Sequence, residues 1–135
     1  MCSDVYDFTK ESIQKFKDAG ANIGMVQVGN EITNGLLGIY SNRDKGESFN
    51  VIWGDKKKST EYLKAGIKAV REYTPQALVA LHLETPNVWK YKTIMNTWKR
   101  DNVDYDVLGS SYYPFWSIAA KANTPKTLKD VQTLA

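Results

Sequence analysis

The feature that most constrains this chain is its alternation between amphipathic helical segments and short apolar runs. Three runs rich in valine and leucine are separated and flanked by segments whose apolar residues recur at helical spacing. We expect the strands at residues 24–30, 78–84 and 106–112. Strands that alternate with helices in this way predict a parallel sheet with right-handed crossovers. The sequence therefore predicts an α/β fold in which an initial helix is followed by three strand and helix units.

Four helices are expected between and around these strands. Their approximate ranges are residues 5–19, 60–73, 88–98 and 125–134. The inward stripe of the initial helix is expected to be Val5, Phe8, Ser12, Phe16 and Ala19. Residues 32–58 predict a long loop, in which the lysines at 56–58 form a solvated patch. The aromatic rings of Phe49 and Trp53 in this loop either contact a ligand or pin the loop to the body.

Polar side chains follow each predicted strand where it ends. Asn30 and Glu31 follow the first strand, and His82 and Glu84 close the second. Alternation predicts that Glu31 shares a strand face with Gln27, away from the valines. Because the carboxyl ends of parallel strands meet at one edge of a sheet, we expect these groups to line a cleft there. The alternative is that Asn30 caps the next segment and Glu31 is a solvated loop acid.

Composition limits the classes that remain. A chain of 135 residues can bury one domain core but is shorter than the roughly 250 residues of an eight-stranded barrel. Cys2 is the only cysteine, which excludes an intrachain disulfide and a cysteine metal cluster, and the net charge is only +3. We therefore expect no nucleic-acid partner, no metal site and no membrane association. The chain contains no apolar run of 18 residues and no signal peptide.

Two stretches resemble one family closely. Residues 26–37, which begin Val-Gln-Val-Gly-Asn-Glu-Ile, are similar to the fourth strand and following loop of the arabinogalactan endo-β-1,4-galactanases. Residues 110–116, Ser-Ser-Tyr-Tyr-Pro-Phe-Trp, are similar to the sixth-strand motif of the same family, which is glycoside hydrolase family 53 in the barrel glycosidase clan A. The resemblance spans essentially the whole chain. It implies an internal fragment of the catalytic domain, namely residues 1–135 as a partial (β/α)8 TIM barrel from about the third helix to the sixth.

The resemblance also implies roles for individual residues. Glu31 matches the general acid/base, and Asn30 matches the residue that binds the 2-hydroxyl of the sugar being cleaved. The remaining implied substrate-binding residues are His82, Glu84, Tyr112, Tyr113 and Trp116. Retaining glycosidases need a second carboxyl group about 5 to 5.5 Å away as the nucleophile. In the family that residue closes the seventh strand, which has no counterpart in this chain.

The implied activity is endo-hydrolysis of β-1,4-galactosidic bonds in plant galactan and arabinogalactan by a secreted, extracellular enzyme, monomeric at full length. The family needs no organic cofactor, although some members bind calcium through later loops.

Several other functions remain open. A barrel glycosidase acting on mannan or cellulose is the nearest alternative, followed by an inactive fragment that only binds carbohydrate. A doubly wound nucleotide-binding domain would share the alternation of strands and helices, but the chain has no Gly-x-Gly-x-x-Gly turn. A non-catalytic carbohydrate-binding module would need the aromatic residues but not the acid. The presence of both Asn30 and Glu31 counts against such a module.

Overall fold

A three-stranded parallel sheet organises the chain in the computed structural model, which describes residues 2–36, 41–42, 47–116 and 122–134. Its strands are β1 (Met25–Gln27), β4 (Leu78–Glu84) and β5 (Val107–Ser111). The central strand β4 pairs in parallel with β1 on one edge and with β5 on the other. The expected parallel α/β sheet is confirmed, and it is open: among the described strands, β1 and β5 each have one edge without a partner.

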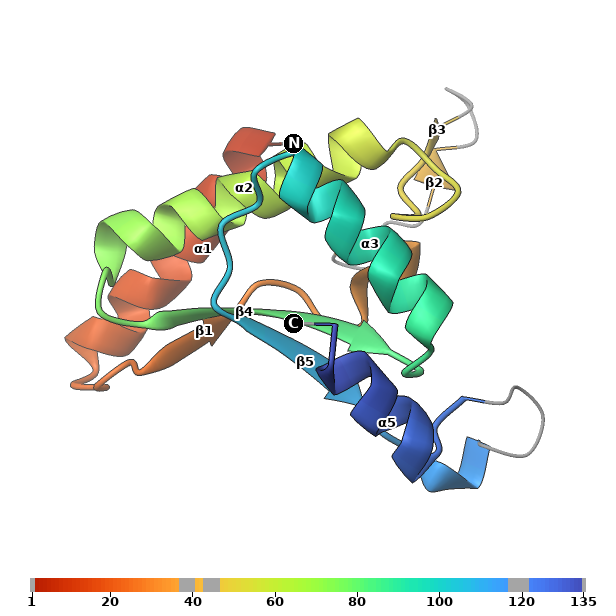
Figure 1. Cartoon of the computed structure of the whole chain (residues 1–135). Coiled ribbons are helices and arrows are strands. Elements are labelled where there is room, and N and C mark those ends of the chain that lie inside the picture. The colour runs from red at the N-terminus through yellow and green to blue at the C-terminus, as the bar shows by residue number, and fades with distance from the viewer. Residues whose placement is uncertain (1, 37–40, 43–46, 117–121, 135) are drawn as a thin grey trace.

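Helices connect the strands as the sequence predicts. They are α1 (Cys2–Asp18), α2 (Lys56–Tyr73), α3 (Val88–Arg100) and α5 (Pro125–Gln132). The first three lie on one side of the sheet, and α5 follows β5 near its carboxyl end (Figure 1). Short elements fill the connections: η1 (Ile32–Asn34), the small antiparallel pair β2 (Ser41–Asn42) and β3 (Glu47–Ser48), and η3 (Pro114–Trp116).

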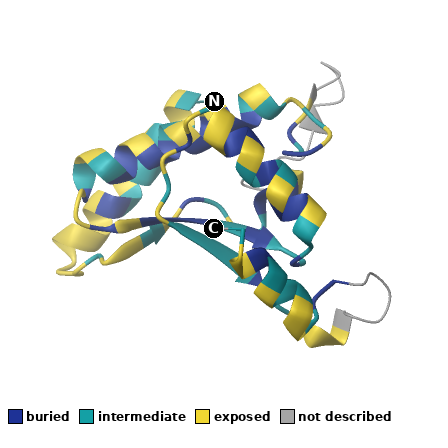
Figure 2. Cartoon of the chain, in the orientation of Figure 1, coloured by how far each residue is buried: buried dark blue, intermediate teal, exposed yellow. Residues whose placement is uncertain are grey.

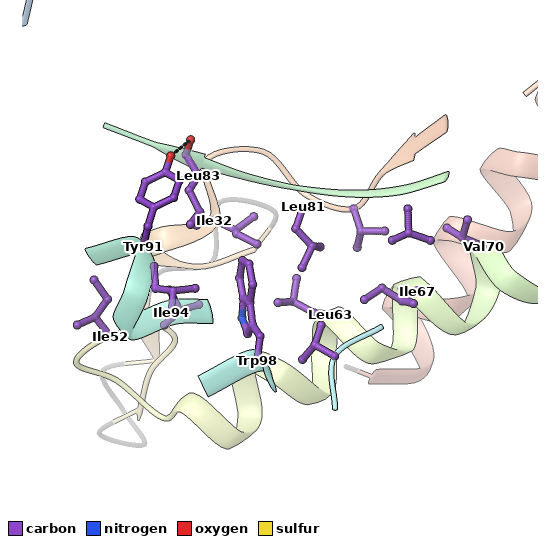
Figure 3. Packing of buried hydrophobic residues seen from close by; sticks show 14 of the residues in the cluster. Ile32, Ile52, Leu63, Ile67, Val70, Leu81, Leu83, Tyr91, Ile94 and Trp98 are labelled. Atoms are coloured by element: carbon purple, nitrogen blue, oxygen red, sulfur yellow. Dashed lines mark hydrogen bonds between the residues drawn. The ribbon is translucent and has the colours of Figure 1, made fainter. Parts of the chain in front are cut away.

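The core lies between the sheet and the helices. Val79, Leu81 and Leu83 alternate along β4, and all three are fully buried. Figure 3 shows the packing of Leu81 and Leu83 with residues of α2 and α3, including Leu63 and the fully buried Trp98. The other side of β4 carries Ala80, His82 and Glu84, as the alternation predicted. Burial along the helices is correspondingly one-sided (Figure 2).

Two expectations about the helices are wrong. Phe8 and Phe16 of α1 are 62% and 63% exposed, whereas Ile13 is the buried residue of this helix. The helix contacts α2 where Val5 and Thr9 lie near Gly66, so Val5 of the expected stripe does face inward, whereas Phe8 and Phe16 border an apolar groove between α1 and β1. The lysines at 56–58 are not a loop either. They form the first turn of α2, because Asp55 caps the helix by accepting a hydrogen bond from the Lys58 N–H.

The first strand is also shorter than predicted. β1 ends at Gln27, although the Val28 N–H still donates to the Ala80 carbonyl at 2.9 Å. Gly29 then takes φ +80°, and a Cβ atom at this position would collide with side-chain atoms of Ile32 and Leu36. Glycine is thus required where the chain leaves the sheet, and simple strand alternation does not extend to Glu31.

Candidate active site

Glu31 is positioned by a tight turn after β1. Its backbone has φ 50° and ψ 52°, a left-handed conformation that costs a non-glycine residue of order 1–3 kcal/mol. Directly after it, η1 begins with Ile32, which is only 1% exposed and belongs to the core. The buried Ile32 anchors the turn, and the turn carries the Glu31 side chain toward the ends of the neighbouring strands.

A chain of hydrogen bonds joins the ends of all three strands. Ser111, the last residue of β5, donates to Oε1 of Glu31 at 2.6 Å. Its Oγ also lies 3.0 Å from Nε2 of His82 on β4, and Nδ1 of His82 lies 2.9 Å from Oδ1 of Asn30. Gln27 donates from Nε2 to the same Asn30 oxygen at 3.3 Å. Asn30, Glu31 and His82, which were expected at one edge of the sheet, therefore do meet there, with Ser111 between Glu31 and His82.

The proton positions in this chain depend on one another. When the Ser111 hydroxyl donates its proton to Glu31, Oγ of Ser111 can bond to His82 only as an acceptor. Nε2 of His82 must then carry the proton of that hydrogen bond. The Asn30 oxygen that faces Nδ1 forms a hydrogen bond only with an Nδ1 that carries a proton. In the neutral ring, Nδ1 instead accepts from the Glu31 N–H, which lies 3.3 Å away. His82 thereby links the Asn30 side chain to the carboxylate of Glu31.

Glu84 occupies a separate cluster beside this chain. Lys90 of α3 forms an ion pair with its Oε1 at 2.6 Å, and Thr33 of η1 donates to its Oε2 at 2.9 Å. Burial opposes ionisation of Glu84, but the hydrogen bonds from Lys90 and Thr33 outweigh it, so the pKa of this carboxyl is lowered below its usual range. Both carboxylate oxygens are thus engaged by protein groups, whereas Oε2 of Glu31 accepts no hydrogen bond from the described residues.

The aromatic motif after β5 is only partly described. Tyr112 is half-buried, and Tyr113 is 55% exposed with its backbone N–H donating to Asn123 at 3.4 Å. Trp116 ends η3, but its side chain lies outside the described residues. Among the described residues, no hydrogen bond connects the side chains of Tyr112 or Tyr113 to Glu31.

Three polar residues of these clusters were not named as site residues from the sequence, namely Ser111, Lys90 and Thr33. Ser111 closes the third strand inside the recognised motif, so its place at a strand end was an available signal. Lys90 and Thr33 carried no such signal, because a lysine at the start of a helix and a threonine in a loop are ordinary surface residues. Only the packing of α3 and η1 against the end of β4 brings them to Glu84.

No metal centre or membrane helix is found in the described parts of the chain. Among residues 2–36, 41–42, 47–116 and 122–134, no three His, Cys, Asp or Glu side chains are grouped to hold an ion. None of the described helices is long and apolar enough to cross a bilayer. The apolar groove between α1 and β1 lies at the free edge of the sheet and includes neither Glu31 nor His82.

Comparison with known proteins gives a consistent answer. The model of glycosyl hydrolase family 53 matches residues 1–134. The endo-β-1,4-galactanase of Bacillus subtilis (strain 168) is 42% identical over 113 residues, which are 83% of this chain and 23% of that protein. The arabinogalactan endo-β-1,4-galactanase of Humicola insolens is 31% identical over 122 residues, covering 86% of this chain and 34% of its own length.

A solved structure agrees with these sequence matches. The Ignisphaera aggregans GH53 catalytic domain superposes with a TM-score of 0.67 at 28% identity, over 85% of this chain and 29% of that one. The chain therefore spans about a quarter to a third of the length of these relatives. From the family match and the shared structure, the chain belongs to glycosyl hydrolase family 53.

Proposed function

We propose that this chain is the central part of a galactanase catalytic domain, in which Glu31 is the general acid/base. The complete enzyme would hydrolyse internal β-1,4-galactosidic bonds of galactan and arabinogalactan. Arabinogalactan is the substrate in the name of the Humicola insolens relative. The observation that carries the proposal is the Glu31 carboxylate at the junction of β1, β4 and β5, held on one oxygen by Ser111. Its other oxygen is available to a glycosidic oxygen.

The hydrogen-bond chain supports this role chemically. A general acid must present its proton to the leaving oxygen, and the same group must later take a proton from water. The Ser111 hydroxyl holds Oε1 of Glu31 and so fixes the orientation of the carboxyl group. Oε2 is then left to donate the proton to the leaving oxygen and later to accept one from water. His82 holds Asn30 at the same time, so the residue proposed to bind the sugar 2-hydroxyl is oriented together with the acid/base.

The nucleophile is proposed to come from outside these 135 residues. Glu84 is the other acid at this edge, but its ion pair with Lys90 and its hydrogen bond from Thr33 occupy both oxygens. A carboxylate bound in this way is a weak nucleophile, so Glu84 suits a substrate-orienting role. In a closed (β/α)8 barrel the strand edges of β1 and β5 would be paired, and a later strand would supply the second carboxylate.

The remaining assignments follow the family. The Tyr112-Tyr113 pair is expected to orient the nucleophilic carboxylate and, with Trp116, to border the sugar subsites. We also propose a secreted, monomeric enzyme at full length that needs no organic cofactor.

The test is a screen of polysaccharides with a full-length protein that carries this chain. Galactan and arabinogalactan are compared with β-mannan and cellulose at equal mass, and reducing ends are measured over time. Release of galacto-oligosaccharides from galactan, with little release from the other polymers, is the expected result. Faster hydrolysis of mannan or cellulose would overturn the substrate assignment, and inactivity on all four polymers would overturn the enzyme assignment.

A further inference from the structure

Two tryptophan side chains stack on each other at the surface. The rings of Trp53 and Trp89 lie 5.4 Å apart between centroids with an interplanar angle of 29°. They are 76% and 55% exposed, whereas Trp98 of the same chain is completely buried. Two large apolar rings that remain in water, side by side, form a contiguous patch of the kind that marks a binding site.

The loop that carries Trp53 is built to hold it. Oδ1 of Asn50 accepts hydrogen bonds from the N–H groups of both Ile52 and Trp53, each at 2.8 Å. Val51 and Ile52 within this turn are buried, while Phe49 packs edge-on against Tyr62. Phe49 thus pins the loop to the body, and the Trp53 ring is left facing solvent.

This turn is tied to the segment that follows Glu31. The side chain of Asn50 donates to Asn34 at 2.8 Å, and the Val51 N–H donates to the Thr33 carbonyl at 2.9 Å. Thr33 and Asn34 belong to η1, which starts one residue after Glu31. Trp53 is therefore fixed relative to the acid/base by a short path of hydrogen bonds.

Trp89 approaches from the neighbouring unit. It is the second residue of α3, which is separated from the end of β4 by residues 85–87, and the next residue, Lys90, pairs with Glu84. Both rings consequently follow the carboxyl ends of strands that also deliver Glu31, His82 and Glu84. The stacked rings are thus linked through η1 to the segment after Glu31 and through Lys90 to Glu84.

We propose that Trp53 and Trp89 form a stacking platform for galactosyl residues of the polymer at a distance from the bond that is cleaved. This inference rests on the proposed galactanase function and deepens it by naming a remote subsite. The axial 4-hydroxyl of galactose leaves the C3, C4 and C5 hydrogens together on one face, which suits a flat aromatic ring. Two rings are too small for a protein partner, since a stable interface buries about 800 Å² on each side.

The experiment measures binding and hydrolysis as a function of substrate length in a full-length protein that carries this chain. The variants are Trp53→Ala, Trp89→Ala and Trp53→Phe, with Phe16→Ala as a control that removes an aromatic ring on α1 whose exposed fraction lies between those of the two tryptophans. We expect the two alanine variants to raise KM for polymeric galactan about three- to tenfold. Turnover of a short chromogenic galactoside that occupies only the cleavage site should be unchanged, and Trp53→Phe should keep most of the affinity.

The outcomes separate this inference from the proposed function. If the wild-type protein neither binds nor cleaves galactan, the proposed function has failed and the platform has no substrate. If the wild-type protein is active and Trp53→Ala and Trp89→Ala match Phe16→Ala at every substrate length, the platform is overturned. Equal losses on long and short substrates would also contradict it, because a remote subsite acts only on chains that reach it. Melting temperatures serve as the folding check, and Trp53→Phe decides the question if an alanine variant is destabilised.

Discussion

The hydroxyl group of Ser111 donates to Oε1 of Glu31 at 2.6 Å, although the two residues are 80 positions apart in the chain. The contact joins the carboxyl end of β5 to the turn after β1, across the end of β4. It exists only when the three strands are in register, so the sheet and the candidate site form together. Ser111 is also within 3.0 Å of His82, which extends the connection to Asn30.

Replacement of Ser111 by alanine should therefore lower turnover more than substrate affinity. Hydrogen bonds to a charged group contribute about 1.5–3 kcal/mol, so a loss of tenfold to a hundredfold in kcat is expected if the orientation of Glu31 is lost. Ser111→Thr retains a hydroxyl group and should restore much of the activity. Steady-state kinetics on galactan, measured over a range of pH, checks both variants in a full-length protein.

Ser110 provides the matched control. Its hydroxyl group lies one residue earlier and 2.7 Å from the Tyr91 hydroxyl, on the side that packs against α3. Ser110→Ala is expected to lower stability without changing the pH profile of activity. If Ser111→Ala behaves in the same way, Ser111 only packs at the end of the strand and does not position the acid/base.

The ion pair between Glu84 and Lys90 should make stability depend on pH in the acid range. Because the folded-state pKa of Glu84 is lowered, its contribution to stability is present above the ordinary pKa of a glutamate and is lost as the pH falls through the folded value. Glu84→Gln should cost about 2–3 kcal/mol near neutral pH, since the side chains are only 24% and 11% exposed. Chemical denaturation of a full-length protein at several pH values measures this.

The exposed pair Lys126–Asp130 is the control for that measurement. Its side chains are 81% and 37% exposed, and Lys126→Ala should change stability by less than about 1 kcal/mol. A Glu84→Gln variant as stable as wild type at pH 7, with the same pH dependence, would show that the buried pair contributes no net stability.

The sequence predicted the elements of this fold better than their packing. β4 was expected at residues 78–84 and lies there, because its run of apolar residues is bounded by turn residues on both sides. The inward stripe of α1 was only partly right, since Val5 lies near Gly66 of α2 but Phe8 and Phe16 are exposed. They line the same apolar groove as the buried Ile13, and helical spacing alone does not tell which part of one broad apolar side is covered.

The candidate site shows the same limit. Asn30, Glu31 and His82 were predicted from strand ends and a family motif, and they do lie within one hydrogen-bond chain. Strand alternation was the wrong argument for Glu31, because Gly29 and the left-handed Glu31 backbone redirect the chain. Lys90 could not be predicted, since its contact with Glu84 depends on how α3 packs.

The aromatic motif after β5 leads to a prediction that separates two roles. Tyr113 is 55% exposed, so Tyr113→Phe should leave stability nearly unchanged and lower turnover if its hydroxyl orients a carboxylate. Trp116→Ala should instead weaken the binding of galacto-oligosaccharides. Kinetics and calorimetric titration measured on the same preparations distinguish these effects. Loss of thermal stability alone in both variants would mean that these are packing residues.

Expressed alone, these 135 residues should be neither an active galactanase nor a well-folded monomer. The described sheet leaves one edge of β1 and one edge of β5 unpaired, and exposed edges favour association between chains. Phe8 and Phe16 add exposed apolar surface beside β1. Light scattering and denaturant unfolding should show oligomers and a broad transition. A monomer with a sharp two-state transition that hydrolyses galactan would contradict this prediction and would assign the nucleophile to Glu84.

The most direct test of the central claim is the rate of galactan hydrolysis by Glu31→Gln in a full-length protein that carries this chain. The amide keeps the shape of the side chain and can still accept from Ser111, but it cannot transfer the proton. The account predicts a loss of about a hundredfold or more on galactan and a smaller loss in glycosylation by activated aryl galactosides, whose leaving groups need no protonation. Wild-type turnover of galactan by Glu31→Gln would contradict the assignment of Glu31 as the acid/base.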